Sequence, residues 1–442
     1  MAAHRCCTIV TLLGLLFFFS LILAQGAAAA ASEVEVEGGG LHLDELNRLL
    51  APDADHLAAS ESNLQRWLAH VRLTSSQLPY THVGSNSPKY ASSSLASEDK
   101  HVALTVLDTR FNNSKRLESA RGSSSNRKSH RVCTKNVIYV EKDGSGNFTT
   151  VQAAINSLPR RNKCRVDIQI GVGVFREKVM IKRSRPHVTL KGSSQGSTII
   201  VYNDTASSRD KHGRLLGTIH SASVSINSNY FIAKNIAFMN TAPAQKPGAV
   251  RQQAVALRIS GDKAAFFDCK FYAHQDTLYD HRGRHYFKNC YITGTVDFIF
   301  GYGRSFYEGA ELVALPDFGN PGSITAQKRN ETTLDTGFSF VNSRITGAGM
   351  VYLGRAWGND SRVVFANTYM DDIVVPEGWG DWGIPARQKT VFYAQFNCTG
   401  PGADTSHRVS WARNLTAEEA APFLTPGFIN GEKWLEGYKE HH

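Results

Sequence analysis

Cysteine is scarce in this chain, with seven among 442 residues. Two stand at the N-terminus, and the other five form an odd set that allows at most two pairs within the chain: Cys6 and Cys7, then Cys133, Cys164, Cys269, Cys290 and Cys398. So few possible cross-links exclude a small disulfide scaffold. A buried apolar core must therefore supply the stability of the fold.

Long apolar runs are also missing, except at the N-terminus. There a short basic start precedes an apolar run from about Thr8 to Leu23, and small residues follow. This order is typical of a secretory signal peptide, which we predict for residues 1–26. A single membrane anchor is the alternative, because the run approaches the ~18 residues of a spanning helix, but the small residues favour cleavage. We expect a secreted, extracellular protein without stable membrane association.

Glycosylation is the other expectation that follows from secretion. Acceptor triplets of the N-x-S/T type begin at Asn112, Asn147, Asn203, Asn330, Asn359, Asn397 and Asn414. The chain is also basic, with a formal charge of +10, but it lacks zinc-finger spacing, a basic recognition helix and aromatic RNA-binding motifs, so we expect no nucleic-acid partner. An extracellular polyanion such as an acidic polysaccharide suits this charge, although solubility alone would also explain it.

Helical patterns and tight hairpin dipeptides are rare in the second half of the chain. Residues 27–131 are rich in Ala, Ser and charge and contain one helical patch, so we predict a weakly ordered leader. From residue 137 the sequence consists of short β-branched and aromatic runs separated by Gly, Asn and Asp, which predicts an all-β domain over residues 132–442. Short helical segments are expected only near the C-terminus, around LTAEEAAPFL.

A loose internal repeat indicates the architecture of this domain. It places Asn or Asp after an aromatic or aliphatic residue and before a small and then an apolar residue, at Asn235, Asp268, Asn289, Asn342 and Asn367. The intervals fit one or two coils of a parallel β-helix, in which like residues stack. Asn and Asp tolerate the left-handed backbone of such turns. A β-sandwich is the alternative, but its hairpin dipeptides are missing between most strands.

Two acidic motifs, YAHQDTLYD with Asp276 and GTVDFIFG with Asp297, enclose a strand-turn-strand passage. In a coiled fold both carboxylates would emerge from stacked coils onto one face. A third motif, LGRAWG, offers Arg355 and Trp357. A lone Asp is more often a simple turn former, but neighbouring carboxylates with an Arg are typical of a reaction centre.

The chain resembles the plant pectin methylesterases through motifs spread over residues 136–438. These are GSGNFTTVQAAINSLP, GVFREKV, QQAVALR, the two acidic motifs, LGRAWG, RVSWAR and FINGEKWL. The resemblance implies a right-handed parallel β-helix that hydrolyses the methyl esters of polygalacturonate in the cell wall. It implies no cofactor and no metal, a monomer, and a proteinaceous pectinesterase inhibitor as a candidate partner. The leader has no cysteine between Cys7 and Cys133, so we do not expect the inhibitor-like helical pro-domain of many relatives.

Site roles also come from the resemblance. It implies Asp297 as nucleophile, Asp276 as general acid and then base, and Gln253 and Gln275 as oxyanion donors, with Thr218, Gln253, Arg355 and Trp357 in substrate binding. Chemistry supports this division, because ester hydrolysis needs an ionised carboxylate, a proton for the leaving group and donors for the developing oxyanion. Two close acids are driven to different protonation states, and Arg355 would hold Asp297 ionised.

Further aromatic and basic side chains are candidates for the sugar-binding surface. We expect Trp357, Tyr272, Tyr279 and Phe298 to offer faces to a sugar ring, and Tyr302 and Arg304 are candidates for lining the cleft. Cys290 lacks the partner usual in the family, because Ala310 stands at that place. It is therefore either free or paired with Cys269.

Competing signals are weaker. Residues 192–196 match the G-x-S-x-G elbow of serine esterases, but a strand-like segment follows where that motif needs a helix, so Ser194 is expected in a turn. His274 beside Asp276 lacks a second ligand at metal-binding spacing. A pectin lyase or polygalacturonase would need a calcium–carboxylate cluster or acids placed about a glycosidic bond. A non-catalytic pectin-binding protein is the remaining alternative.

Overall fold

The computed structural model describes residues 136–244, 250–316 and 321–439. The predicted signal peptide and leader lie outside the described residues. No helix in the described segments is both long and apolar enough to cross a membrane.

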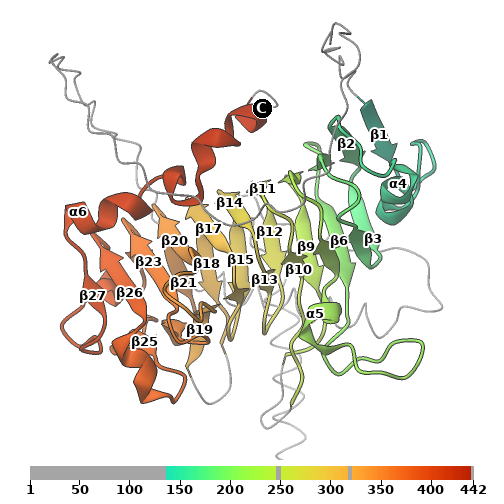
Figure 1. Ribbon diagram of the computed structural model, residues 1–442. Helices are drawn as coiled ribbons and strands as arrows, with labels where there is room; N and C mark the ends of the chain where they lie inside the picture. Colours follow the sequence, from blue (N-terminus) through green and yellow to red (C-terminus); the bar gives the residue numbers. More distant parts are fainter. Residues whose placement is uncertain (1–135, 245–249, 317–320, 440–442) are drawn as a thin grey trace, which may run out of the picture. The chain divides into compact units, whose positions relative to one another are not determined.

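Three parallel β-sheets make up the described domain (Figure 1). Sheet A contains, in spatial order, β1 (Asn136–Val140), β2 (Val166–Ile170), β5 (Val188–Gly192), β8 (Ile232–Lys234), β11 (Ala264–Phe267), β14 (Arg284–Lys288), β17 (Arg304–Glu308), β20 (Gly337–Val341), β23 (Arg362–Ala366), β26 (Phe392–Phe396) and β27 (Arg413–Asn414). Sheet B contains β3 (Gly173–Arg176), β6 (Thr198–Tyr202), β9 (Ala237–Asn240), β12 (Lys270–Tyr272), β15 (Tyr291–Gly294), β18 (Glu311–Ala314), β21 (Arg344–Gly347) and β24 (Tyr369–Met370). Sheet C contains β4 (Val179–Ile181), β7 (Val224–Ile226), β10 (Leu257–Ile259), β13 (Leu278–Asp280), β16 (Ile299–Gly301), β19 (Gly322–Gln327), β22 (Val351–Arg355) and β25 (Trp379–Gly380).

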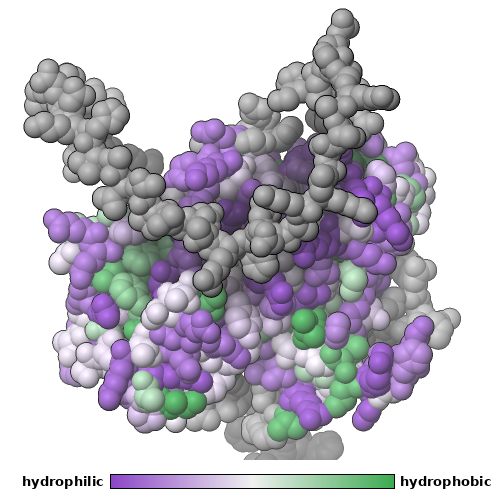
Figure 2. Space-filling view, in the orientation of Figure 1, coloured by the Kyte–Doolittle hydropathy of each residue, from purple (hydrophilic) through white to green (hydrophobic). Residues whose placement is uncertain are grey.

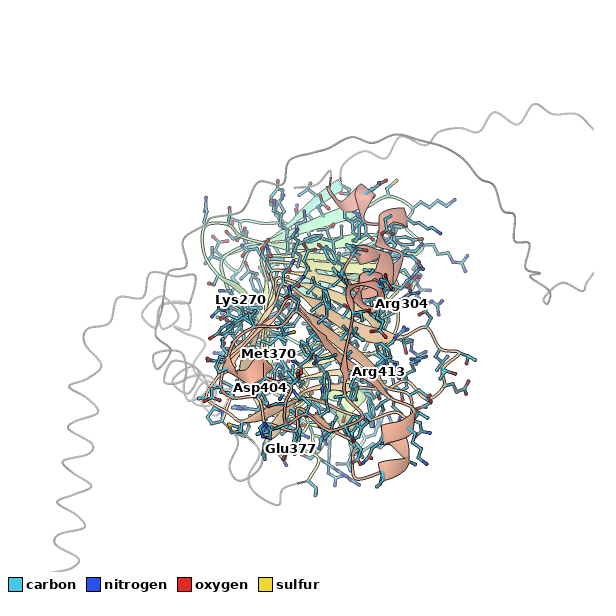
Figure 3. All side chains as sticks on the ribbon, turned by 90° about the vertical axis from the view of Figure 1, so that its left-hand side faces the viewer. Lys270, Arg304, Met370, Glu377, Asp404 and Arg413 are labelled. Carbon is cyan, nitrogen blue, oxygen red and sulfur yellow. The ribbon has the colours of Figure 1, made fainter. Side chains whose placement is uncertain are left out.

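Each coil takes one strand from each sheet in turn and lies in register on the next coil. The coil β11–β12–β13, for example, pairs throughout with β14–β15–β16. Seen along the stack, Lys270 of sheet B and Arg304 of sheet A lie on opposite sides (Figure 3). This is the parallel β-helix that the repeat predicted, with the right-handed coiling that the resemblance implied.

The turn between sheets A and B carries the repeat. Its five predicted positions all have left-handed backbone, with φ between 48° and 53°: Asn235, Asp268, Asn289, Asn342 and Asn367. The structure adds Gly309 and Asn397 to the same series. Asn side chains also link coils, because Asn397 Nδ2 donates to Asn367 Oδ1 at 2.8 Å. The turn chemistry inferred from the sequence is therefore confirmed.

Five consecutive coils each contribute one stacked aromatic ring to the core. Phe266, Phe287, Tyr307, Phe340 and Phe365 form a continuous column with ring centroids 4.4–4.7 Å apart and interplanar angles of at most 15°. All five side chains are fully buried. In-register parallel pairing brings like residues together, so a sequence repeat becomes a column of rings.

A buried polar cluster ties neighbouring coils together beside this column. His285 Nδ1 lies 2.6 Å from Asp280 Oδ1, and His285 Nε2 lies 2.9 Å from the Gly261 carbonyl oxygen. The Tyr307 hydroxyl donates to Asp280 Oδ2 at 2.7 Å. All three side chains have no exposed surface, so each polar contact replaces water that cannot reach the group.

Helices cover parts of the solenoid. They are α4 (Val151–Ser157), α5 (Gly217–Ser221), η1 (Pro385–Lys389), η2 (Pro401–Ala403), α6 (Ala417–Ala420), η3 (Ala421–Phe423), η4 (Pro426–Ile429), η5 (Gly431–Lys433) and α7 (Glu436–Lys439). The predicted C-terminal helical segment is α6, which Thr416 and Glu419 start with a capping box. The segments from α6 onward pack apolar side chains such as Phe428 and Trp434 on the outer face of sheet A.

Two details concern the predicted turns and cysteines. Ser194 is exposed in the turn between β5 and β6, as expected, and no helix follows it. Cys269 and Cys290 are both buried free thiols, so the free alternative holds for Cys290. Burial raises the pKa of the Cys269 thiol to about 12, and burial followed by the neighbouring Cys269 raises that of Cys290.

Candidate active site

Asp276 and Asp297 occupy equivalent positions on adjacent coils. Each stands two residues before a paired position of sheet C, because Leu278 of β13 pairs with Ile299 of β16. Adjacent strands lie about 4.8 Å apart, so the two acids are close neighbours. Both have left-handed backbone, with φ of 63° for Asp276 and 51° for Asp297. Asp is among the few residue types that adopt this conformation readily, which explains why an acid can sit at the turn into sheet C.

Asp297 is held by Arg355 of β22. Arg355 Nε donates to Asp297 Oδ1 at 2.7 Å, and one terminal guanidinium nitrogen donates to Oδ2 at 2.6 Å. The Ser323 hydroxyl of β19 donates to Oδ1 at 2.5 Å. Asp297 is 5% exposed, so these charge-assisted bonds act in a largely dehydrated place. The predicted contact between Arg355 and Asp297 is present.

Asp276 has the opposite environment. It is 7% exposed, and no described residue donates a hydrogen bond to its carboxylate. Burial first, and then the charge of Asp297, raises its pKa well above the ordinary value, while Arg355 lowers it by a smaller amount. One acid is therefore paired with a cation, and its neighbour lies in an environment that raises its pKa.

Gln253 and Gln275 lie on the coils that lead up to the acids. Ala254, next to Gln253, donates its backbone N–H to the Gln275 carbonyl oxygen at 3.1 Å. Both side chains are half-buried. The Gln275 Oε1 atom is buried without a hydrogen-bond partner in the described part of the chain, and no described residue bonds the Gln253 side chain. Both amides thus remain available to a ligand.

Thr218 lies on α5, which is attached to the Gln253 segment. The Ser221 hydroxyl of α5 donates to the Thr218 carbonyl oxygen at 2.9 Å and accepts the Val255 N–H at 3.2 Å. Gln253 itself accepts the Ala206 N–H at 2.8 Å, and Ala206 accepts the Gly217 N–H at 3.0 Å. Thr218 is half-buried, and Figure 2 shows apolar surface around α5, where Leu215 and Ile219 are exposed.

An aromatic row continues from the acids along the outer face of sheet C. Tyr279 stacks on Phe300 at 4.2 Å between ring centroids, Phe300 lies 6.0 Å from Trp357, and Tyr302 lies 5.6 Å from Trp357. Trp357 is half-buried and packs against this cluster. The predicted residues Tyr279, Tyr302 and Trp357 are thus brought together, and Phe300 was not foreseen.

Two expectations about the sugar-binding surface are wrong. Phe298 is fully buried in the main core and has no face for a sugar. Arg304 belongs to β17 of sheet A, where it pairs with Asp335 and lies over the Phe428 ring. Tyr272 was a further candidate for the sugar-binding surface, and its ring packs on Tyr291 in sheet B.

Trp382 is a site residue that sequence reasoning missed. Its ring lies 4.2 Å from the Arg355 guanidinium carbon, and it is 37% exposed. Its backbone is left-handed, with φ of 65°, which is unusual for a bulky residue and is often found at functional sites. The motif GWGDWG carried no signal that would have separated Trp382 from the buried Trp379. No group of three His, Cys, Asp or Glu side chains within the described segments is placed to bind a metal.

Comparisons with known proteins agree on one family. The pectinesterase family model matches residues 137–432. The chain is 44% identical over 309 residues to Probable pectinesterase 8 of Arabidopsis thaliana, a match that covers 69% of this chain and 77% of that protein. It is 46% identical over 301 residues to pectinesterase QRT1 of the same plant, covering 68% and 78%.

Solved structures give the same result. The pectin methylesterase from carrot superposes with a TM-score of 0.62 at 35% identity, covering 70% of this chain and 98% of that one. A pectin methylesterase in complex with a hexasaccharide superposes with a TM-score of 0.57 at 28% identity, covering 67% and 97%.

Proposed function

The chain belongs to the pectinesterase family, and from that premise we propose that it hydrolyses pectin methyl esters with Asp297 as nucleophile and Asp276 as general acid and base. Its activity is that of a carboxylic ester hydrolase acting on methyl-esterified polygalacturonate. The single observation that carries the residue assignment is the split environment of the two acids. Arg355 binds one carboxylate with two hydrogen bonds, whereas burial raises the pKa of the other.

In the first half-reaction an Asp297 oxygen attacks the ester carbonyl carbon, and the carbonyl oxygen becomes negative. The free amide groups of Gln253 and Gln275 are suited to donate to this oxygen, because they are neutral and bound to no described side chain. Asp276 gives its proton to the departing methoxide, which leaves as methanol. An anhydride then joins the galacturonyl group to Asp297.

In the second half-reaction water attacks the galacturonyl carbonyl carbon. Asp276, now ionised, takes the proton of this water, and the Asp297 carboxylate leaves. The free acid of the product then releases its proton to solvent. Arg355 and Ser323 meet the returning charge on Asp297, and Asp276 is protonated again for the next turnover.

Methanol release from methyl-esterified pectin tests this assignment. We expect Asp297→Asn to abolish release while the protein stays folded. The matched control is Asp268→Asn, because Asp268 is an exposed Asp with the same left-handed backbone at the turn between sheets A and B. Asn occupies the equivalent place in other coils, so the control should retain full activity. Activity in the Asp297 variant would remove the nucleophile from this proposal.

The rival readings differ in product. A lyase or polygalacturonase shortens the polymer without releasing methanol, and a non-catalytic protein binds it unchanged. Measurements of viscosity and of polymer binding, made beside methanol release, separate all three.

We further propose that residues 1–26 direct secretion to the cell wall, that residues 27–131 form a leader other than an inhibitor-like bundle, and that residues 132–442 act as a monomer open to a proteinaceous inhibitor.

A further inference from the structure

Asn240 is a buried polar residue at the end of β9, and its side chain bonds three separate segments. Nδ2 donates to the Asp204 carbonyl oxygen at 2.8 Å, to the Val255 carbonyl oxygen at 3.1 Å and, more weakly, to the Ser221 carbonyl oxygen at 3.4 Å. Oδ1 accepts the Ala242 N–H at 3.0 Å. Asn240 has no exposed surface, so the protein itself satisfies both ends of the amide.

These contacts close the base of the connection that carries Gln253. Residues 241–256 join β9 to β10, and the bond to Val255 ties the end of this connection back to its start. The equivalent connection of the next coil, residues 273–277, is a short turn that carries Gln275. The amide on the long connection therefore needs a tie that the amide on the short turn does not.

A second route leads from Asn240 to Gln253. The segment held at Asp204 continues to Ala206, whose N–H donates to the Gln253 carbonyl oxygen at 2.8 Å. The backbone of Gln253 is thus fixed at its own carbonyl by Ala206, and at the carbonyl two residues later by Asn240. Because Asn240 is fully buried, it acts on a reaction through Gln253 and not by touching a ligand.

We propose that Asn240 is a positioning residue, which holds the Gln253 amide where the ester carbonyl oxygen becomes negative. The inference rests on the proposed function, because it concerns the oxyanion donors of the same reaction. A donor stabilises a developing charge best when its place is fixed before the reaction, and small displacements near a reaction centre lower the rate strongly. Loss of the Asn240 amide should therefore lower kcat and change KM little.

A purely structural role for Asn240 would be to stabilise the fold. That role predicts a lower unfolding temperature with an unchanged kcat in the folded protein. The positioning role predicts a loss of kcat in protein that is fully folded, and predicts that this loss disappears once the Gln253 amide has been removed. A double-mutant cycle between the two residues therefore separates the roles.

The test measures methanol release from methyl-esterified pectin, well below the unfolding temperature of each variant. Asn240→Ser should lower kcat about 10- to 100-fold, and Gln253→Leu should lower it about 100- to 1000-fold. The kcat of the double variant should match that of Gln253→Leu alone. Asn240→Asp serves as a second variant, because it keeps the shape and the acceptor for Ala242 but loses the amide donors; it should lose kcat in the same way.

Thr198→Val is the matched control. Thr198 is also buried and ties separate backbone segments, because its hydroxyl donates to the Gly171 carbonyl oxygen at 2.9 Å and accepts the Ser193 N–H at 3.0 Å. It begins β6, whereas the residue that pairs with Asn240, Tyr202, ends that strand. The control should lower the unfolding temperature and keep the full kcat.

The outcomes are distinct. Folded Asn240→Ser and Asn240→Asp proteins with the unmodified kcat overturn the inference, as does an Asn240→Ser loss that is equally large with and without the Gln253 amide. A loss of kcat in Gln253→Leu but not in Asn240→Ser leaves the proposed function intact and the inference wrong. Failure of the unmodified enzyme to release methanol contradicts the proposed function itself.

Discussion

Replacing Arg355 by Met should reduce turnover strongly without unfolding the protein. The change removes two charge-assisted hydrogen bonds to Asp297, at 2.7 and 2.6 Å, but preserves an apolar stem of similar length. The Asp297 carboxylate would remain buried with the Ser323 hydroxyl as its partner. Its negative charge would then face the Asp276 carboxyl without a compensating cation.

The size of the loss follows from the geometry. A hydrogen bond to a charged group contributes about 1.5–3 kcal/mol, and the Arg355 side chain is 35% exposed, so screening reduces each bond toward the lower end. Together the two bonds are worth about 2–4 kcal/mol, which corresponds to a roughly 30- to 1000-fold fall in kcat. The Arg355→Lys variant keeps the positive charge but not the bidentate contact. Its kcat should therefore lie between that of Arg355→Met and that of the unmodified enzyme.

The assay is methanol release at saturating methyl-esterified pectin, with thermal unfolding of the same samples. Arg344→Met is the control, because Arg344 lies over the Tyr369 ring in sheet B, at 4.7 Å, and touches neither acid. Its kcat should match that of the unmodified enzyme. A folded Arg355→Met protein with kcat within twofold of the unmodified value would refute the claim that the nucleophile depends on its two hydrogen bonds from this guanidinium.

Three further results are expected. Burial, and then the charge of Asp297, raise the pKa of Asp276. The folded state therefore holds a proton on Asp276 that the unfolded chain releases near pH 4. The contribution of this proton to folding stability is complete below that pH and is lost as the pH rises through the folded pKa. Asp276→Asn should therefore abolish methanol release yet raise the unfolding temperature at pH 7, with a smaller gain near pH 4; an equal gain at both values would contradict the assignment. Tyr307→Phe leaves Asp280 Oδ2 buried without its donor and should cost about 1–3 kcal/mol in urea unfolding, whereas no loss would show that this bond contributes little. Cys269 and Cys290, which are buried with raised pKa values, should react with a charged thiol reagent only after unfolding, and fast reaction of the native protein would contradict their burial.

The turn residues could be inferred from the sequence, because left-handed positions select Asn and Asp, whereas the two acids were found through their motifs and the family resemblance. Coil spacing could be counted from Asn235 to Asn367, and the contact between Arg355 and Asp297 was expected from the family resemblance. Phe298 shows where such reasoning fails. The left-handed turn at Asp297 breaks the alternation of inward and outward side chains, so Phe298 and Ile299 both enter the core.

Contacts between distant segments could not be inferred. Trp382 reaches Arg355 from a loop beyond β25, and Lys328 meets Trp357 from another coil. Neither residue stands in a motif that marked the site in the sequence, and each pairing depends on how two loops project from the solenoid. The prediction that Arg304 lines the cleft failed for a related reason. The turn after β16 is short, because β16 ends at Gly301 and β17 of sheet A already begins at Arg304.

Trapping of the covalent intermediate tests the two-acid mechanism most directly. Enzyme turning over methyl-esterified oligogalacturonide in hydroxylamine should acquire a hydroxamate at residue 297, detected by peptide mass spectrometry, and none without substrate. Undiminished methanol release with residue 297 unlabelled and another side chain modified would contradict the account.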